Sequence, residues 1–346
     1  MTQYKLAFLG FGNVGRALGR LLNQKRDELS ERYNIEFIVT GISTGNHGTA
    51  ISPQGLDLEQ AIKVVEGNSG DGLNRLSSIP FTGNSLAFID SCEADVLFEN
   101  TPVNYATGQP AVDHIQRGLE LGMHVVTANK GPVVHAYKRL TELAKRKGVK
   151  FYFESAVMDG APIFSLFRDT LPASNLKRFQ GVLNSTTNMI LTRMEQGESF
   201  DQAVAYAQQI GIAETDPSGD IDGWDASVKV AALVTVIMGV SLKPDQVDRQ
   251  GIRQITPERI AEAGTQGKRW KLVCTAERVG EGVKAVVRPE LVDRNSPMFA
   301  TEGTTSVMQF ETDVLGKLSI IEENPGPVTT AYGCLADFIN AVIRQE

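Results

Sequence analysis

The strongest constraint on the fold is a glycine-rich turn that joins a short apolar run to a helical pattern within residues 4–16. The turn reads Gly10-x-Gly12-x-x-Gly15, and a second strand pattern follows at residues 37–42. In this motif the first glycine permits a tight turn, the second lets the backbone approach a pyrophosphate, and the third lets the helix pack closely. The free N–H groups at the start of the helix attract the phosphates. The motif in this context predicts dinucleotide binding by Gly10, Gly12, Asn13, Val14 and Gly15.

Strand and helix patterns alternate through the first half of the chain. Strand patterns lie at 4–9, 37–42, 96–98, 124–127 and 149–153, and helical patterns at 14–33, 103–121 and 133–147. Such alternation is typical of a parallel sheet with helices on both faces. The segment 43–87, rich in glycine, serine and asparagine, interrupts the alternation, and we interpret it as a surface insertion with a short helix at 56–66.

In the second half of the chain, strand and helical patterns no longer alternate regularly. Strand patterns lie at 179–184, 283–287, 306–312 and 318–322, and helical patterns at 199–210, 224–238 and 330–342. We therefore predict an α/β protein with an N-terminal Rossmann-type parallel-sheet domain and a second α+β domain. The first domain is expected to comprise residues 1–150 plus 325–346, with the last helix packed back on it, and the second residues 151–324.

Composition narrows the class of protein. A formal net charge of −7 over 346 residues argues against a phosphate backbone as the main ligand. The three cysteines are far apart and form no CxxC pair, which argues against a disulfide framework or a thiolate metal site. The N-terminus shows no signal-peptide pattern, and no apolar run is long enough to span a bilayer. We expect a cytoplasmic enzyme with neither a nucleic-acid nor a membrane partner.

Residues 207–229 concentrate charged side chains around an Asp-Pro turn and two glycines. A helical pattern begins at Trp224, so Asp225 and Lys229 lie on one helix face. One interpretation is an ordinary surface ion pair at the start of a helix. The density of acids in a glycine-rich loop, together with a second lysine in the loop at 127–132, favours a functional site instead.

This segment resembles the signature of the homoserine dehydrogenase family. The matching positions are Ala207, Gly211, Asp216-Pro217, Asp220-Ile221, Gly223, Asp225 and Lys229. Further stretches of the chain are similar to the family at 10–15, 100–102, 128–130, 154–157 and 326–327. The chain resembles a short form, without the C-terminal regulatory domain or the fused aspartate kinase of longer members.

The resemblance implies reversible oxidation of L-homoserine to L-aspartate 4-semialdehyde with NAD(P), a step toward threonine, isoleucine and methionine. It also implies a homodimer, with substrate binding, catalysis and dimerisation in the second domain. Lys229 resembles the proton donor or acceptor, and Lys130 the second catalytic lysine, which lies near the nicotinamide. A buried lysine can take this role because desolvation lowers its pKa. The substrate-binding acids of the family match Glu214 and Asp225, and Asp220 is a third acid on the same loop.

Further cofactor contacts are carried over from the resemblance to Asn100, Thr101, Lys130, Gly211 and Gly326. The second strand ends as Thr40-Gly41-Ile42-Ser43-Thr44, without the acid that usually holds the ribose hydroxyls of NAD. Ser43 could instead donate a hydrogen bond to a 2′-phosphate. We therefore expect NADP to be favoured over NAD, with use of NAD left open.

The family also has a monovalent cation, usually sodium, bound by main-chain carbonyls. The matching donors are Glu154, Val157, Asp159 and Ala161. Many members have small residues where this chain has Met158-Asp159, so an acidic side chain stands at the expected site. A plain strand-to-helix turn is the alternative interpretation of this stretch.

Two other functions remain open at this point. The chain could be a dehydrogenase of another small amino acid or aldehyde, or a nucleotide-binding sensor without catalysis. A sensor would need neither Lys130 nor Lys229, and both are present.

Overall fold

The computed structural model describes residues 1–67 and 72–343. The chain forms two compact units. Unit 1 comprises Met1–Pro162 together with the C-terminal segment from Gly326, and unit 2 comprises Ile163–Pro325. Unit 1 continues past residue 150 because the strand β6 (Phe151–Tyr152) pairs with its sheet. None of the helices in the described ranges combines the length and apolar character that a membrane span requires.

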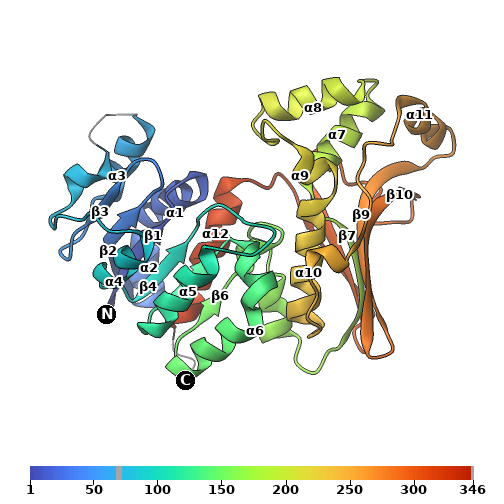
Figure 1. The fold of residues 1–346 in the computed structure, drawn as a ribbon. Coiled ribbons are helices and arrows are strands. Elements are labelled where there is room, and N and C mark those ends of the chain that lie inside the picture. Colours follow the sequence, from blue (N-terminus) through green and yellow to red (C-terminus); the bar gives the residue numbers. More distant parts are fainter. Residues whose placement is uncertain (68–71, 344–346) are drawn as a thin grey trace. The chain divides into compact units, whose positions relative to one another are not determined.

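The sheet of unit 1 has the strand order β3-β2-β1-β4-β5-β6 (Figure 1). The pairs β1–β2, β1–β4, β4–β5 and β5–β6 are parallel, and β3 pairs antiparallel with β2. The strands besides β6 are β1 (Thr2–Leu9), β2 (Ile35–Ser43), β3 (Thr49–Ile51), β4 (Val96–Glu99) and β5 (His124–Thr127). The predicted Rossmann-type parallel sheet is therefore confirmed. Its strand order reverses between β1 and β4, which is where open α/β sheets bind ligands.

Helices flank this sheet. They are α1 (Asn13–Gln24), α2 (Arg26–Tyr33), α3 (Leu58–Glu66), α4 (Ser85–Ser91), α5 (Ala111–Glu120), α6 (Lys130–Lys147) and α12 (Pro327–Val342), with 3₁₀ turns at Leu73–Leu76 and Glu154–Ala156. The single helix expected at 14–33 is interrupted at Lys25, which caps both helices. Helix α1 buries a leucine-rich face, whereas α2 is polar and buries only Leu29. The helix expected from Val103 begins only at Ala111, because Asn104 closes a turn by accepting from the N–H groups of residues 106 and 107.

Helix α12 completes the core of unit 1, packing against α1. Its Ala331, Cys334, Leu335 and Phe338 lie in one buried cluster with the apolar side chains of β1 and α1. The Phe338 ring makes edge contacts with Tyr4 and Phe98, at centroid distances of 6.2 and 6.0 Å.

We expect Phe338→Ala to destabilise unit 1. Phe338 is fully buried, so its removal leaves a cavity between α12 and the sheet and is expected to cost about 3–5 kcal/mol. Chemical denaturation of the variant and of wild type measures this difference. Tyr332→Ala on the exposed side of the same helix is the control, and equal losses in the two variants would contradict the described packing.

Unit 2 holds a second sheet, with the order β12-β11-β7-β9-β10-β8. Every pair is antiparallel except β10–β8. The strands are β7 (Leu176–Val182), β8 (Asp248–Arg249), β9 (Arg269–Val279), β10 (Gly282–Val292), β11 (Ser306–Thr312) and β12 (Lys317–Glu322). The helices are α7 (Ser185–Glu195), α8 (Phe200–Gln209), α9 (Ser218–Ile221), α10 (Trp224–Ile237) and α11 (Pro257–Thr265). This mixed sheet confirms the predicted second α+β domain.

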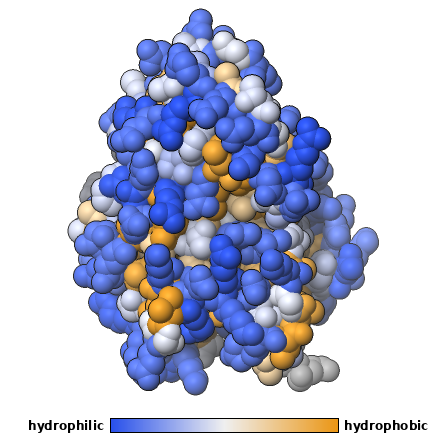
Figure 2. All heavy atoms as spheres, turned by 90° about the vertical axis from the view of Figure 1, so that its right-hand side faces the viewer, coloured by the Kyte–Doolittle hydropathy of each residue, from blue (hydrophilic) through white to orange (hydrophobic). Residues whose placement is uncertain are grey.

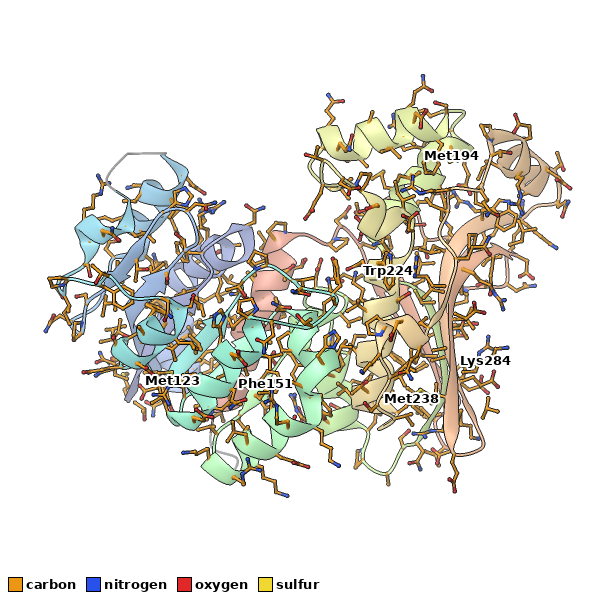
Figure 3. All side chains as sticks on the ribbon, viewed as in Figure 1. Met123, Phe151, Met194, Trp224, Met238 and Lys284 are labelled. Carbon is orange, nitrogen blue, oxygen red and sulfur yellow. The ribbon has the colours of Figure 1, made fainter. Side chains whose placement is uncertain are left out.

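Helix α10 packs against β9 and β10, and its ends are marked by Trp224 and Met238 in Figure 3. Lys284 projects from β10 on the side away from this helix (Figure 3). Strand register aligns Lys284 with a row of alternating charges: Glu277, Arg178, Glu311 and Lys317. Opposite charges on neighbouring strands attract, which favours this register. Figure 2 faces this side of the molecule and shows it as mainly hydrophilic, with scattered hydrophobic atoms.

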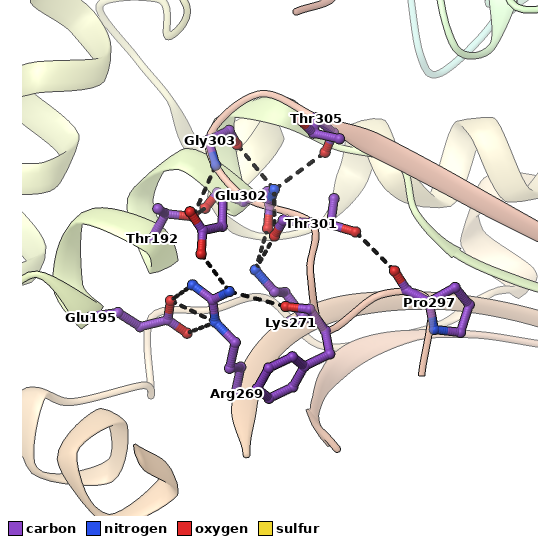
Figure 4. Close-up of polar contacts among 11 residues, drawn as sticks. Thr192, Glu195, Arg269, Lys271, Pro297, Thr301, Glu302, Gly303 and Thr305 are labelled. Atoms are coloured by element: carbon purple, nitrogen blue, oxygen red, sulfur yellow. Dashed lines mark hydrogen bonds and ion pairs between the residues drawn. The ribbon is translucent and has the colours of Figure 1, made fainter. Parts of the chain in front are cut away.

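The buried residue Lys271 connects α7 with the loop before β11 through hydrogen bonds (Figure 4). Lys271 on β9 is fully buried, and its Nζ donates to Asn188 Oδ1 at 2.9 Å and to the Thr301 carbonyl at 2.5 Å. The Asn188 amide nitrogen in turn donates to the carbonyls of Gly303 and Thr305, at 3.0 and 3.2 Å. Next to this group, Arg269 pairs with Glu195 and Glu302. These contacts place polar groups in the core with their hydrogen bonds satisfied.

Burial lowers the pKa of Lys271 from 10.5 to about 8. Between these two values the unfolded chain binds more protons than the folded one, so this residue makes stability rise with pH. Below pH 8 both states are charged and the full cost of burying the charge remains. The variant Lys271→Met lacks this titration. The free energy of unfolding of wild type minus that of the variant should therefore increase above pH 8, by up to about 1.4 kcal/mol per pH unit.

Urea denaturation of both proteins between about pH 7.5 and 9.5 measures this difference. The buried thiols titrate in both proteins and cancel. Lys284→Met, at an exposed lysine on β10, is the control and should follow wild type. A difference that stays constant with pH would contradict the assignment.

Candidate active site

The glycine turn after β1 is built so that only glycine fits at two of its positions. Gly10 has a φ of 92°, and a Cβ there would lie 2.4 Å from the Asn100 carbonyl oxygen. A Cβ on Gly15 would lie 2.7 Å from the Gly10 carbonyl oxygen. A Cβ on Gly12 would meet nothing within 4 Å, so the backbone is open on that side. Gly12 is the N-cap of α1, so the free N–H groups at the start of that helix adjoin the open side.

Asn100 follows β4 directly, beside the glycine turn at the point where the strand order reverses. Its Oδ1 and Nδ2 atoms are both buried, and neither has a hydrogen-bond partner in the described structure. A buried amide without partners is costly and rare in a folded protein. The pair of atoms offers a donor and an acceptor to a polar ligand, which fits the carboxamide of a nicotinamide.

A hydrogen bond between Thr101 and Asn129 connects the segments that follow β4 and β5. Asn129 Nδ2 donates to the Thr101 carbonyl at 3.2 Å, and Asn129 Oδ1 accepts from Gly131 N at 3.0 Å. Asn129 is thereby the N-cap of α6, whose first residue is Lys130. The structure thus brings Thr101 and Lys130 to the same edge of the sheet. The role of Asn129 was not predicted, although an asparagine before a helical pattern is an N-cap signal.

Ser43 closes β2 at the same edge, and its carbonyl accepts from Gly10 N at 2.9 Å. Its side chain is buried, and its Oγ lies 2.9 Å from Thr49 Oγ1. The two hydroxyls can share one proton in this contact and leave the other for a ligand.

In unit 2 three of the predicted residues, Asp220, Asp225 and Lys229, meet around Asn184. Lys229 Nζ donates to the Leu183 carbonyl at 2.6 Å and lies 3.0 Å from Asp225 Oδ2. Asn184 Nδ2 donates to Asp220 Oδ1 at 2.6 Å and to Asp225 Oδ2 at 3.0 Å. The Lys229 and Asp225 side chains are 16% and 9% exposed, so this ion pair is far less solvated than an ordinary surface pair.

The electrostatics of the cluster single out Asp220. Burial raises the pKa of Asp220, the charge of Asp225 raises it further, and the hydrogen bond from Asn184 opposes the shift. Two carboxylates close together disfavour double ionisation. The cluster therefore gains from an additional positive group near Asp220 and Asp225.

Asn184 was not predicted as a site residue. It ends the strand pattern at 179–184 and is the N-cap of α7, accepting from Thr187 N at 2.8 Å. The signal for it was the sequence Asn-Ser-Thr-Thr after a strand, which favours the start of a helix.

Glu214 and Gly211 lie apart from this hydrogen-bonded cluster. Both are exposed, on the segment between α8 and α9. The Glu214 carbonyl accepts from Gln208 Nε2 at 3.2 Å, and Gly211 adopts a φ of 75° just after α8. Neither residue takes part in the described hydrogen bonds among Asn184, Asp220 and Lys229.

The loop from Glu154 to Ala161 contains a sharp turn and makes hydrogen bonds with α12. Met158 and Asp159 have φ values of 54° and 46°, so two successive non-glycine residues are left-handed. Glu154 N donates to Asp337 Oδ2 at 2.7 Å, which anchors the start of the loop. Within the described ranges, His, Cys, Asp and Glu side chains form no group of three suited to a metal. The oxygen donors of this loop include its main-chain carbonyls and the carboxylates of Glu154 and Asp159, and such hard donors suit a hard cation.

Gly326 stands just before α12, and its N–H donates to Thr329 Oγ1 at 2.8 Å. The Thr329 hydroxyl also lies 3.5 Å from Asp159 Oδ2. The start of α12 is therefore connected to the loop that contains the predicted cation donors.

Comparison with known proteins gives a consistent result over both units. Residues 10–154 match the family model described as the homoserine dehydrogenase NAD-binding domain, and residues 162–339 match that of homoserine dehydrogenase. A homoserine dehydrogenase of Methanocaldococcus jannaschii is 38% identical over 97% of both chains. The NAD(+)-dependent homoserine dehydrogenase of Pseudomonas canavaninivorans is 33% identical over 100% of this chain and 99% of that protein.

Solved structures agree. A putative homoserine dehydrogenase from Archaeoglobus fulgidus superposes with a TM-score of 0.86 at 30% identity, covering 97% of this chain and 98% of that one. A hyperthermophilic archaeal homoserine dehydrogenase in complex with NADPH gives a TM-score of 0.82 at 29% identity, covering 98% of both chains.

These similarities support the first predicted function and lend no support to the other dehydrogenase or the sensor. The glycine turn and the unsatisfied Asn100 amide fit the nicotinamide cofactor that the family uses. The chain belongs to the homoserine dehydrogenase family of NAD(P)-dependent oxidoreductases, which act on a CH–OH group in amino-acid biosynthesis.

Proposed function

We propose that Lys229 exchanges a proton with the substrate oxygen while homoserine and aspartate 4-semialdehyde interconvert. The observation that carries the proposal is the anchoring of Lys229 Nζ by the Leu183 carbonyl and Asp225 in a nearly buried cluster. NAD(P), when bound, would supply the hydride chemistry at the substrate carbon. In oxidation the hydroxyl proton passes to the Lys229 amine, and in reduction its ammonium returns a proton to the carbonyl oxygen. Lys130 assists from the start of α6, near the cofactor.

The acids of unit 2 bind the ammonium group of the substrate. Asp225 and Asp220 both accept hydrogen bonds from Asn184, and burial together with the charge of Asp225 raises the pKa of Asp220. A substrate ammonium would relieve the repulsion between the two carboxylates. Glu214 supplies a third carboxylate from the exposed segment before α9.

Asp225→Asn is expected to raise the KM for L-homoserine by about 10- to 100-fold, because it removes a charged hydrogen bond to the substrate. The KM for the cofactor should change by no more than about twofold, and steady-state kinetics separate the two values. Asp222→Asn, which alters an acid paired with Arg253 on the same segment, is the matched control. A selective increase in the cofactor KM would refute this role.

We propose that the cofactor is NADP, with NAD as a weaker substitute. Support comes from the end of β2, which bears no acid and ends in Ser43, whose hydroxyl lies beside that of Thr49 on β3. The residues proposed to hold it are Gly10, Gly12, Asn13, Val14, Gly15, Ser43, Asn100, Thr101, Lys130, Gly211 and Gly326. The ratio of kcat/KM for the two cofactors tests the preference, and a higher value for NAD would overturn it.

We further propose a sodium ion on the carbonyls of Glu154, Val157, Asp159 and Ala161. The left-handed turn at Asp159 and its anchoring on α12 support this assignment. Isothermal titration with NaCl against choline chloride tests it without the reaction. No sodium-specific heat would exclude the site.

A homodimer formed through unit 2 and a cytoplasmic location complete the proposal. The three cysteines are buried free thiols, which suits a reducing compartment. Analytical ultracentrifugation of the full chain tests the dimer, and a monomer at micromolar concentration would contradict it.

A further inference from the structure

We propose that Glu99 is a positioning residue whose buried side chain holds both Thr101 and the segment that leads to Lys130. It is the last residue of β4 and is fully buried. This inference rests on the proposed roles of Thr101 and Lys130, and it concerns contacts within unit 1 alone.

The first set of contacts reaches Thr101. Glu99 Oε1 accepts from the Thr101 backbone N–H at 3.2 Å and from the Thr101 hydroxyl in a short hydrogen bond. Since that hydroxyl donates its proton inward to Glu99, it presents only lone pairs outward. Thr101 is thereby set as an acceptor, suited to an N–H of the nicotinamide carboxamide.

The second set of contacts reaches α6. Glu99 Oε2 lies 3.0 Å from Thr127 Oγ1, and the Glu99 carbonyl lies 2.7 Å from the same atom. Thr127 Oγ1 accepts in turn from Asn129 N at 2.9 Å. Asn129 caps the helix that begins at Lys130 and also donates to the Thr101 carbonyl. One side chain therefore connects the proposed cofactor contact to the proposed catalytic lysine.

The burial of Glu99 indicates that its carboxyl group has a role beyond packing. A carboxyl group removed from water loses hydration that only good hydrogen bonds replace. Glu99 obtains them from groups at the functional edge of the sheet, with His114 on α5 as a further buried neighbour at 3.7 Å. If position 99 served only for packing, a hydrophobic side chain of the same size would fill it without the cost of burying a carboxyl group.

Glu99→Leu removes the side-chain contacts with Thr101 and Thr127 while keeping bulk, and it leaves only the backbone carbonyl of residue 99 to accept from Thr127 Oγ1. We expect kcat for L-homoserine to fall by about 10- to 100-fold, because the reacting groups lose their alignment. NADPH should bind about 10-fold more weakly, whereas 2′,5′-ADP, which lacks the nicotinamide, should bind within about twofold of wild type. Both affinities are measured by calorimetry without substrate, so they test Glu99 even if homoserine is not turned over.

Glu99→Gln should recover most of the lost activity, since its oxygen can accept from Thr101 while its amide donates to Thr127. Glu120→Gln on α5 makes the same chemical change at a partly exposed site and should match wild type. Thr127→Val cuts only the second set of contacts, so it should lower kcat while leaving NADPH affinity intact. This variant also carries the test if Glu99→Leu does not fold.

The proposal is overturned by any of three results. Glu99→Leu could weaken NADPH and 2′,5′-ADP equally, which would indicate general damage to the unit. Glu99→Gln could be as impaired as Glu99→Leu. Thr127→Val could keep the wild-type kcat.

Discussion

Replacing Lys229 by alanine is expected to lower kcat for homoserine oxidation by about 1,000-fold or more, the contribution of a well-placed general acid–base. The structure holds Lys229 Nζ in place through the Leu183 carbonyl and Asp225. NADPH affinity should stay within about twofold of wild type, because the glycine turn belongs to unit 1. Stopped-flow kinetics and calorimetry measure the two quantities separately.

Lys284→Ala, at an exposed lysine on β10, is the control and should leave both values unchanged. Added methylamine should restore part of the activity of Lys229→Ala, since a small amine can enter the vacated space and carry the proton. If Lys229→Ala retained a kcat within tenfold of wild type, its role in proton transfer would be wrong.

Replacing Gly10 by alanine is expected to weaken NADPH binding by about 100-fold or more. The added Cβ would lie 2.4 Å from the Asn100 carbonyl oxygen, at a φ of 92° that L-residues rarely adopt. Relief of this clash must move either the turn or Asn100, and both belong to the proposed cofactor site. Fluorescence titration with NADPH measures the loss.

The matched control is Gly264→Ala, in α11 of unit 2, where a Cβ meets nothing within 4 Å. That variant should bind NADPH like wild type and be at least as stable, since alanine favours a helix over glycine. Wild-type affinity in Gly10→Ala would show that the turn does not hold the cofactor.

The sequence predicted those parts of the fold that carry a local pattern. The strand and glycine turn at 4–15 and the charged helix at 133–147 were found because their periodicity is unambiguous. Helix α7 and strand β9 were missed. Helix α7 is buried on most of its surface, and its polar residues Thr186, Thr187 and Asn188 are buried too. The polar residues therefore do not show which face of the helix is exposed to solvent. Strand β9 contains Lys271, which suggests exposure although the residue is fully buried.

In the candidate site, the residues predicted from the sequence were those that match the family signature or lie at a short helical spacing. Asp225 and Lys229 lie one helical turn apart, and their ion pair follows from that spacing. Asn184 joins Asp225 from 41 positions away, and Thr127 joins Glu99 from 28 positions away. Such contacts are created by the packing of separate elements, and no local pattern encodes them.

The most direct test of the proposed activity follows nicotinamide absorbance when purified protein is given L-homoserine with NADP or with NAD. We expect reduced cofactor and L-aspartate 4-semialdehyde in equal amounts, with the faster rate for NADP. Binding of both cofactors without any turnover of L-homoserine would contradict it.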